Sequence, residues 1–421
     1  MRDVLALRVL VTALGVGLGV LYPFISVILA ERGFSPGEIG LISSVGAIGF
    51  TLAVPIWGHL ADVRLGRPRT LQICALGAGF AVAALIVPSP PMIVVALLMI
   101  FWVFQSSWQP LADAITVNAL RGRDYARVRL FTSLGFSVAT ILSGFLYDRT
   151  GYFPAFVLFA VAAAVMVAAA AFLPDVGRAD LAKHRRQSST VASARASMAT
   201  PGTEPRASAD RRWTWRLGSA GIALKVAPGL GAVLAAAALL HVGIISGFTF
   251  LPLRIIELGG SPSDIALSAG ASAGTEIPAM LAMGIVARRV GLRTVFSASA
   301  LVYAACLIAW TVIDVPLLIV ATRVATGAAF AGIVVGVVLT IADLLPADLQ
   351  ATGQALFQTL AFGLAAVVAN VVGGVLYEAA GHVAAFAFGA ILAIAAAVIG
   401  WFAFPRQEPS AGPPVMRQSG A

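Results

Sequence analysis

Twelve long apolar runs, each close to the length of a membrane-crossing helix, dominate this chain. A helix needs about 20 predominantly apolar residues to span a bilayer. Because lipid offers the backbone no hydrogen-bond partners, such runs must be helical. The sequence therefore predicts an all-α membrane protein with twelve transmembrane helices, at about 5–29, 38–60, 70–88, 91–118, 129–147, 153–173, 229–253, 264–287, 294–312, 316–342, 352–377 and 382–404.

The low charge content excludes a soluble enzyme. Charged residues make up 11% of the 421 residues, less than half of the roughly 25% found in soluble proteins. The first run is longer than the about 7–15 residues of a signal-peptide core, so we expect it to be retained.

The runs form two groups of six around a polar stretch at 174–228 that is rich in Arg, Ser, Ala and Pro. This spacing predicts a six-helix bundle over 1–173, a flexible cytoplasmic linker over 174–228, a second bundle over 229–405 and a tail over 406–421. Paired bundles of this kind place a site between the halves near the midplane and alternate its access by rocking. The organisation favours transport over catalysis.

The basic residues cluster in alternate loops and so predict an orientation. With the N-terminus inside, the inner loops and the linker hold most Lys and Arg residues, among them Arg64, Arg67, Arg69, Arg121, Arg123, Arg127, Arg129, Arg288, Arg289 and Arg293. The outer side holds only Arg32, Arg149 and Arg254. Positive charge marks cytoplasmic loops, so both termini are predicted to be cytoplasmic, in a bacterial plasma membrane. We therefore attribute the net charge of +9 to the orientation of the chain in a lipid bilayer. No nucleic-acid partner is expected.

Two matching loops carry a family resemblance. The loop after the second run reads Gly58-His59-Leu60-Ala61-Asp62-Val63-Arg64-Leu65-Gly66-Arg67. It resembles the major facilitator superfamily signature Gly-x-Leu-Ala-Asp-Arg-x-Gly-Arg-Lys, with one extra residue before the second glycine. The equivalent loop of the second half keeps the glycine spacing but has Arg288 in place of the acid. The resemblance implies the major facilitator fold and a conformational switch loop made of Gly58, Asp62, Arg64, Gly66, Arg67, Gly284, Arg288 and Gly291.

Further segments are similar to the phenylpropionate-permease branch, which is allied to the lactose and nucleoside proton symporters. They are Tyr22-Pro23-Phe24, Pro110-Leu111-Ala112-Asp113-Ala114, Thr275-Glu276-Ile277-Pro278 and Gly373-Gly374-Val375-Leu376-Tyr377-Glu378. Many members carry a His before a glycine in helix 10, where this chain has Thr326-Gly327, so no His relay is expected there. The resemblance implies proton-coupled uptake of an aromatic acid, a nucleoside or a sugar.

Glu276 is the carboxylate nearest the middle of a predicted span. It lies twelve residues from Asp264 and twelve from Arg288, at the two ends of the run. A charge at the bilayer centre costs roughly 2.5–3.5 kcal/mol and usually marks a functional site. Burial favours the protonated carboxyl group, so Glu276 is the predicted proton-coupling residue. The alternative is a permanently protonated Glu bonded to a neighbouring helix.

Other polar residues in the spans are weaker candidates. Asp113 and Arg129 flank the turn between spans four and five and are predicted to pair, as a substrate contact or gate or as a purely structural pair. Arg323 is expected to reach Glu276 or a carboxylate substrate, or instead to extend to the outer headgroups. Gln105, Trp108, Gln109 and Asn370 are candidates for lining the cavity. Helix–helix hydrogen bonding or an interfacial belt is the alternative for each.

The sequence has no catalytic or metal-ligand pattern. It lacks a Gly-x-x-x-x-Gly-Lys-Ser/Thr loop, so we expect no ATP-driven step, no cofactor and no metal. The expected partners are a small-molecule substrate and protons, with the chain as a monomer. Two rival functions remain open: a proton-driven exporter, and a non-transporting membrane sensor. The fifth span lacks the Gly-Pro pair of superfamily drug antiporters, which favours uptake.

Overall fold

The computed structural model describes residues 2–120, 125–173 and 217–406. Most of the predicted linker and nearly all of the predicted tail lie outside these ranges. The side chain of Arg129 is also outside the described part, although its backbone belongs to a helix.

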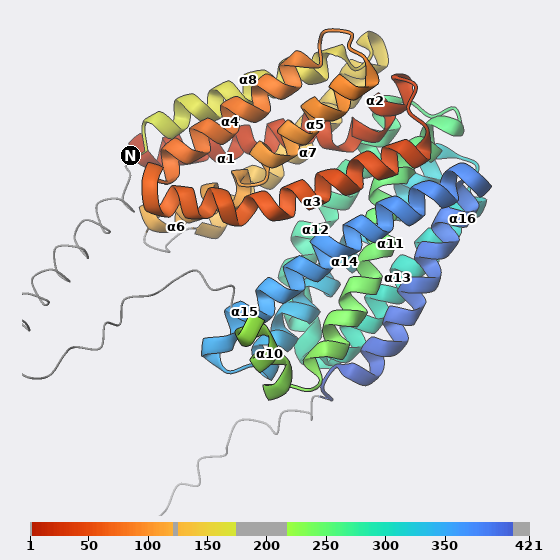
Figure 1. Cartoon of the computed structure of the whole chain (residues 1–421). Helices are drawn as coiled ribbons and strands as arrows, with labels where there is room; N and C mark the ends of the chain where they lie inside the picture. Colours follow the sequence, from red (N-terminus) through yellow and green to blue (C-terminus); the bar gives the residue numbers. More distant parts are fainter. Residues whose placement is uncertain (1, 121–124, 174–216, 407–421) are drawn as a thin grey trace, which may run out of the picture.

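The N-terminal half is a bundle of six crossings, two of them interrupted (Figure 1). The first crossing is α1 (Arg2–Leu21), the 3₁₀ turn η1 (Tyr22–Phe24) and α2 (Ile25–Glu31), and the fourth is α5 (Pro91–Gln105) followed by α6 (Trp108–Leu120). The others are α3 (Pro36–Leu60) with the π-helical turn η2 (Ala61–Leu65), α4 (Arg67–Ala84), α7 (Tyr125–Thr150) and α8 (Phe153–Ala171).

The C-terminal half repeats this arrangement. Its elements are α11 (Leu230–Glu257), α12 (Pro262–Val290), α13 (Leu292–Val312), α14 (Pro316–Leu344), α15 (Ala347–Gln358), η3 (Thr359–Leu364) and α16 (Ala365–Ala403). The helical stretch 349–403 has 55 residues, which at 1.5 Å per residue is about 80 Å and too long for one crossing. It turns back at Gly381, whose φ of 75° ends one helix and begins the next. With this split, the described residues confirm the twelve predicted crossings.

One boundary differs from the prediction. The last residues of the predicted linker form a helix, α10 (Leu217–Val226), which packs on α15. Ala223 and Ala227 are buried there. A ten-residue helix is too short to appear as a membrane-length apolar run, so the sequence placed these residues in the linker.

Matching local structures show the two-fold repeat directly. The helices α3 and α12 both begin with a Ser-Pro capping box, Ser35 with Glu38 and Ser261 with Asp264. The loops before α4 and α13 both turn at a glycine of the same backbone conformation, Gly66 (φ 85°, ψ 152°) and Gly291 (φ 85°, ψ 150°). Positive φ strains residues that have a Cβ. Each signature glycine is therefore required by its turn.

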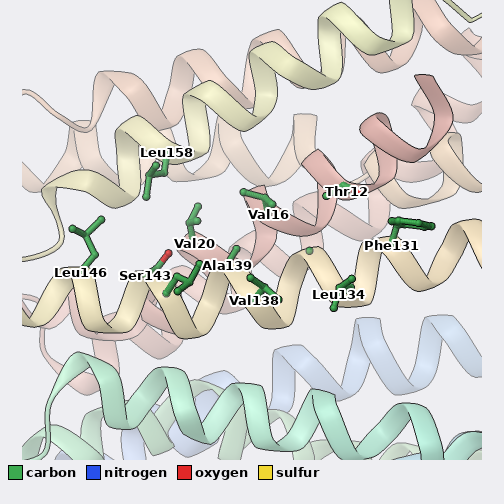
Figure 2. A pocket seen from close by; sticks show the side chains of 12 residues that line it. Thr12, Val16, Val20, Phe131, Leu134, Val138, Ala139, Ser143, Leu146 and Leu158 are labelled. Carbon is green, nitrogen blue, oxygen red and sulfur yellow. The ribbon is translucent and has the colours of Figure 1, made fainter. Parts of the chain in front are cut away.

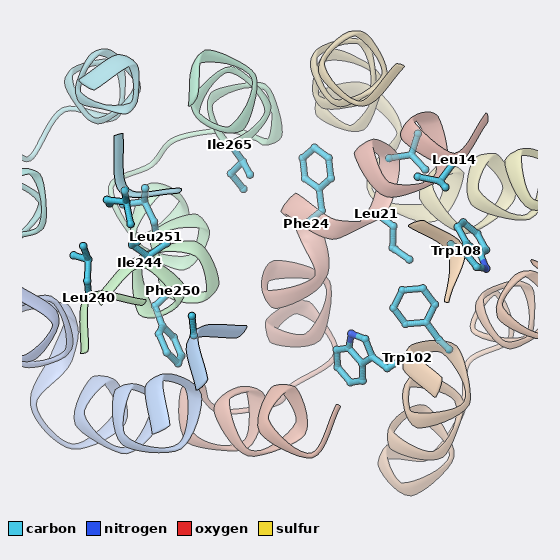
Figure 3. Packing of buried hydrophobic residues seen from close by; sticks show 14 of the residues in the cluster. Leu14, Leu21, Phe24, Trp102, Trp108, Leu240, Ile244, Phe250, Leu251 and Ile265 are labelled. Atoms are coloured by element: carbon cyan, nitrogen blue, oxygen red, sulfur yellow. The ribbon is translucent and has the colours of Figure 1, made fainter. Parts of the chain in front are cut away.

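The halves meet through the helix pairs α3–α16 and α7–α12. They touch at one end of the molecule and diverge toward the end that bears the loops around Arg64 and Arg288 (Figure 1). We call the latter the basic end and the former the opposite end. Figure 3 shows how the packed interiors approach across this junction, with side chains from both halves, including Leu21, Phe24, Trp102, Phe250 and Ile265.

Glycines let the paired backbones come close at the opposite end. A Cβ on Gly40 would lie 2.1 Å from the Asn370 carbonyl oxygen, and one on Gly144 would lie 2.2 Å from the side chain of Ala266. Such small-residue contacts are typical of membrane helix packing.

Candidate functional site

The break in the first crossing directs an aromatic side chain into the space between the halves. Pro23 has no N–H, so the Gly19 carbonyl loses its helical donor. The Thr140 hydroxyl donates to that carbonyl at 3.0 Å, and the Tyr147 hydroxyl donates to the Val20 carbonyl at 2.8 Å. Helix α7 thus satisfies the interrupted backbone, and η1 places Tyr22 beside the interface between the halves.

A central cavity of about 190 Å³ lies between the halves. Its lining residues come from both bundles: Tyr22, Ile25, Ser26, Ser43, Ala47, Phe50, Trp102, Ile245, Phe248, Thr249, Phe362 and Asn370. They combine aromatic faces with hydroxyl and amide groups. None of them carries a carboxylate, an ammonium or a guanidinium group. The cavity therefore suits an uncharged solute.

Two hydrogen bonds hold the polar groups of the cavity. The Tyr22 hydroxyl donates to Gln105 Oε1 at 2.8 Å, and the Thr249 hydroxyl donates to Asn370 Oδ1 at 2.7 Å. Asn370 lines the cavity, as the sequence hypothesis proposed. Gln105 is buried behind Tyr22 and positions its hydroxyl. The bond to Thr249 leaves the Asn370 amide N–H groups for other acceptors.

Two other cavity candidates lie elsewhere. Trp108 has no exposed area and stacks on Phe159, with ring centroids 5.3 Å apart, inside the N-terminal half. Its interpretation as a cavity residue is therefore wrong, because helix α6 turns this ring toward α1 and α8. Gln109 donates to Asp113 Oδ1 at 2.9 Å, one helical turn away. The proposed Asp113–Arg129 pair stays a prediction, since the Arg129 side chain lies outside the described part.

Arg323 belongs to a buried polar cluster in the C-terminal half. Its side chain is 7% exposed and donates to the Thr326 hydroxyl at 3.1 Å. Its guanidinium carbon lies 5.7 Å from the centroid of the Trp310 ring. Arg323 therefore does not extend to the headgroups, which removes one of its two predicted alternatives.

Glu276 lies near the same cluster. It occupies the middle of α12 and is half-buried. Tyr303, which is buried on α13, interacts with the Arg323 side chain and lies within electrostatic range of Glu276. Helices α12 and α14 are in close contact beside it, because a Cβ on Gly327 would lie 2.3 Å from the Thr275 hydroxyl. The carboxyl group and the buried guanidinium thus share one region of the bundle.

Helix α12 continues through Pro278 without a break. Pro278 has no N–H for the carbonyl of Gly274, so one backbone acceptor is released close to Glu276.

The switch loop shows how the extra residue is accommodated. Residues 61–65 form a π-helical turn, and the Gly66 N–H bonds to the Ala61 carbonyl at 3.0 Å. In the second half the Gly291 N–H bonds to Ala287, four residues back, at 2.9 Å. A π turn holds one residue more than an α turn. Both loops therefore reach the same glycine conformation despite the insertion.

Asp62 pairs within its own half. Its carboxylate lies 3.1 Å from Arg67 Nε, and its side chain is 58% exposed. An exposed pair of this kind contributes about 0–1 kcal/mol to the free energy of folding, so its effect on stability is small.

We expect Asp62→Asn to slow substrate flux several-fold while leaving equilibrium binding within about two-fold, because the residue lies at the basic end and not in the cavity. Parallel flux and binding measurements test this, and weakened binding with normal exchange would contradict it.

Two carboxylates join the halves at the opposite end. Glu378 accepts hydrogen bonds from the Gly37 N–H and the Ser35 hydroxyl, both at 2.9 Å, at the start of α3. Asp148 accepts one from the Ser263 N–H at 2.9 Å, at the start of α12. Helix N-termini favour negative charge. We call these two contacts the paired clamps, and they are related by the internal repeat.

The clamps were missed because span-end acids look like ordinary solvated residues. A signal for them was present in the repeated pairs Tyr147-Asp148 and Tyr377-Glu378, which precede matching glycines, Gly151 and Gly381. The aromatic lining contributed by Trp102 and Phe362 was also missed, since neither side chain is polar enough to stand out.

Comparison with known proteins gives a consistent result. Residues 16–388 match the model of the MFS_1 like family. A maltose permease of Geobacillus stearothermophilus is 30% identical over 304 residues, which are 71% of this chain and 68% of the relative. The uncharacterized transporter YwbF of Bacillus subtilis (strain 168) is 29% identical over 163 residues, 38% of this chain and 40% of that protein.

Solved structures share the fold. A point mutant of the nucleoside transporter NupG superposes with a TM-score of 0.74 at 16% identity, covering 96% of this chain and 98% of that one. A D-xylose–proton symporter gives a TM-score of 0.70 at 13% identity, with the same coverage.

Proposed function

Because this chain belongs to the MFS_1 like family of transporters, we propose that it takes up a small uncharged, hydroxyl-rich solute, a sugar or a nucleoside, together with a proton. The protein is a multi-pass membrane transporter and not an enzyme. The substrate class, the coupling and the direction of transport are the proposal.

The composition of the central cavity carries the proposal. Binding sites for small molecules use apolar and aromatic walls with a few well-placed polar groups. Here Trp102 and Phe362 offer ring faces, while Asn370, Thr249 and Tyr22 offer hydrogen bonds. A carboxylate taken from water into such a cavity would need a cation to offset its desolvation, and none lines it. This favours sugars and nucleosides over aromatic acids, in keeping with the names of the maltose and nucleoside relatives.

The shape of the molecule supports alternating access. The paired clamps close the opposite end while the halves diverge at the basic end (Figure 1). We infer from this arrangement and from a cytoplasmic basic end that the two halves are in an inward-facing state.

Orientation is tested by thiol labelling. Both native cysteines are buried, so a Lys225→Cys variant offers one accessible thiol on α10, on the predicted cytoplasmic face. A membrane-impermeant maleimide should label it in inverted vesicles and not in right-side-out vesicles. The reverse pattern would contradict the orientation.

The substrate is tested by uptake into proteoliposomes under a pH gradient, with maltose, a nucleoside and phenylpropionate offered separately. Accumulation of the sugar or the nucleoside is expected. Accumulation of phenylpropionate alone would contradict the neutral-solute proposal. Gradient-driven efflux would instead indicate the exporter, and no flux of any solute would indicate the sensor.

The cavity assignment predicts the effect of Asn370→Ala. Loss of an amide that bonds to a solute hydroxyl costs roughly 1–1.5 kcal/mol, so substrate affinity should fall about tenfold. Thr311→Val is the matched control and should bind normally, because Thr311 is outside the cavity lining and its hydroxyl donates to Ile308 within its own helix. An unchanged affinity in Asn370→Ala would place the site elsewhere.

A further inference from the structure

A second hollow lies on the side of the N-terminal half. This lateral groove, of about 460 Å³, runs between α1, α7 and the start of α8 (Figure 2). Its lining residues are Thr12, Val16, Val20, Phe131, Leu134, Gly135, Val138, Ala139, Leu142, Ser143, Leu146 and Leu158. It shares no residue with the central cavity, and its lining is almost entirely apolar.

The lateral groove faces lipid and not the second half. On α7, the residues that approach α12 are Ile141 and Gly144. The groove residues Val138 and Leu142 lie about 60° and 100° around the helix axis from Ile141 and are 47% and 64% exposed. No described helix covers them. In a bilayer, the surroundings of this surface are hydrocarbon chains.

The dimensions of the groove fit one chain of a lipid. Along α7 it extends from Phe131 to Leu146, a separation of fifteen positions or about 22 Å at 1.5 Å per residue. One leaflet of the hydrocarbon core is about half of the roughly 30 Å total. A groove of this length holds an acyl chain that lies along the helix from the headgroup region past the midplane.

A cation stands at one end of the groove. The Arg8 guanidinium carbon lies 5.3 Å from the centroid of the Phe131 ring, the groove residue closest to the basic end. Arg8 is exposed, and among the side chains that the structure describes, which exclude those of Asp3 and Asp124, no carboxylate forms an ion pair with it. It is 23 residues before Glu31, which ends the first crossing, or about 35 Å at helical rise. Against a core of about 30 Å, this places Arg8 at headgroup depth.

We propose that the lateral groove binds one anionic phospholipid of the leaflet at the basic end, with an acyl chain along α7 and the phosphate on Arg8. Arginine presents a planar fork of donors that matches phosphate oxygens. The stacking on Phe131 orients that fork at the mouth of the groove. Basic groups beside grooves between membrane helices are recognised by acidic headgroups. The combination distinguishes this groove from a lipid-facing surface without a cation.

Native mass spectrometry of the full-length protein with added lipid tests the proposal, with phosphatidylglycerol and phosphatidylcholine as the two probes. The wild type should retain one phosphatidylglycerol in preference to phosphatidylcholine. Arg8→Gln should lower that retention at least about fivefold, and Arg8→Lys should restore part of it. Leu142→Trp, which fills the groove, should lower retention of both lipids.

Matched controls separate this site from general lipid contact. Ile391→Trp, at an apolar residue of α16 that is 64% exposed, and Lys225→Gln, at an exposed cation, should behave as wild type. Helical circular dichroism and a monodisperse peak confirm that each variant is folded. Undiminished retention in Arg8→Gln would overturn the proposal. Loss of phosphatidylglycerol retention in Arg149→Gln but not in Arg8→Gln would also overturn it, because Arg149 is at the other end of α7. So would a result in which inorganic phosphate displaces the lipid while Leu142→Trp leaves its retention unchanged, because the groove would then not hold the acyl chain.

Discussion

Glu276→Gln is expected to abolish proton-driven accumulation while substrate exchange continues. Glutamine has the size and hydrogen-bonding groups of a protonated glutamate but cannot release a proton. One pH unit corresponds to about 1.4 kcal/mol. A symporter that moves one proton with each substrate can therefore sustain about a tenfold accumulation of substrate across a gradient of one pH unit. The variant should reach an inside-to-outside ratio of about one.

The location of Glu276 is the reason for this expectation. The residue lies in the middle of α12, and the buried guanidinium of Arg323 lies in the same region, where Tyr303 interacts with Arg323 and is within electrostatic range of Glu276. Opposite charge nearby favours the ionised carboxylate, and desolvation favours the protonated one. A change in their spacing, as α12 moves within the C-terminal half, would bind and release the proton. We therefore propose that the movement of α12 against α13 and α14 links protonation to access.

Uptake into proteoliposomes with and without a pH gradient checks the prediction, and counterflow of preloaded substrate measures exchange. Glu257→Gln is the matched control. That carboxylate lies 3.9 Å from both Arg254 and His382 at the opposite end of the molecule and should leave accumulation intact. If Glu276→Gln still concentrates substrate in response to the gradient, coupling lies elsewhere, and Asp113 becomes the next residue to test.

The double variant Asp148→Asn with Glu378→Gln is expected to shift the protein toward the state that opens at the opposite end. The two side chains accept three hydrogen bonds across the junction between the halves. Bonds to charged groups contribute roughly 1.5–3 kcal/mol when buried and less at this exposed edge. A combined loss of about 2 kcal/mol would change the ratio of the two states by about 30-fold, since 1.4 kcal/mol is a factor of ten.

A cysteine in place of Ser43, which lines the central cavity, reports this shift. In cells whose outer surface carries the opposite end, an impermeant maleimide reaches Ser43→Cys only when that end opens. Its labelling rate should rise by about the same factor in the double variant. Glu38→Gln is the control, because its carboxylate caps α3 within one half and should not change the rate. An unchanged rate in the double variant would show that glycine packing, and not the clamps, closes this end.

The twelve crossings, the two halves and the position of the paired glycine loops could be predicted from the sequence. Length and apolar character decide whether a segment enters lipid, and both are local properties of the chain. The same holds for the loops at Gly66 and Gly291. Each turn requires a positive φ, so a glycine occurs at the same place in both loops and can be recognised in the sequence. The position of Glu276 in the middle of α12 also followed from counting residues along one helix.

Which residues line the central cavity could be learned only from the tertiary structure. Asn370 and Trp108 were equally good candidates along the chain, yet one lines the cavity and the other stacks inside a half-bundle. The paired clamps likewise join residues that are more than one hundred positions apart. In lipid nearly every face of a helix is apolar. Hydropathy therefore does not specify how a helix is rotated about its axis, and that rotation is set by the packing of glycines and rings between helices.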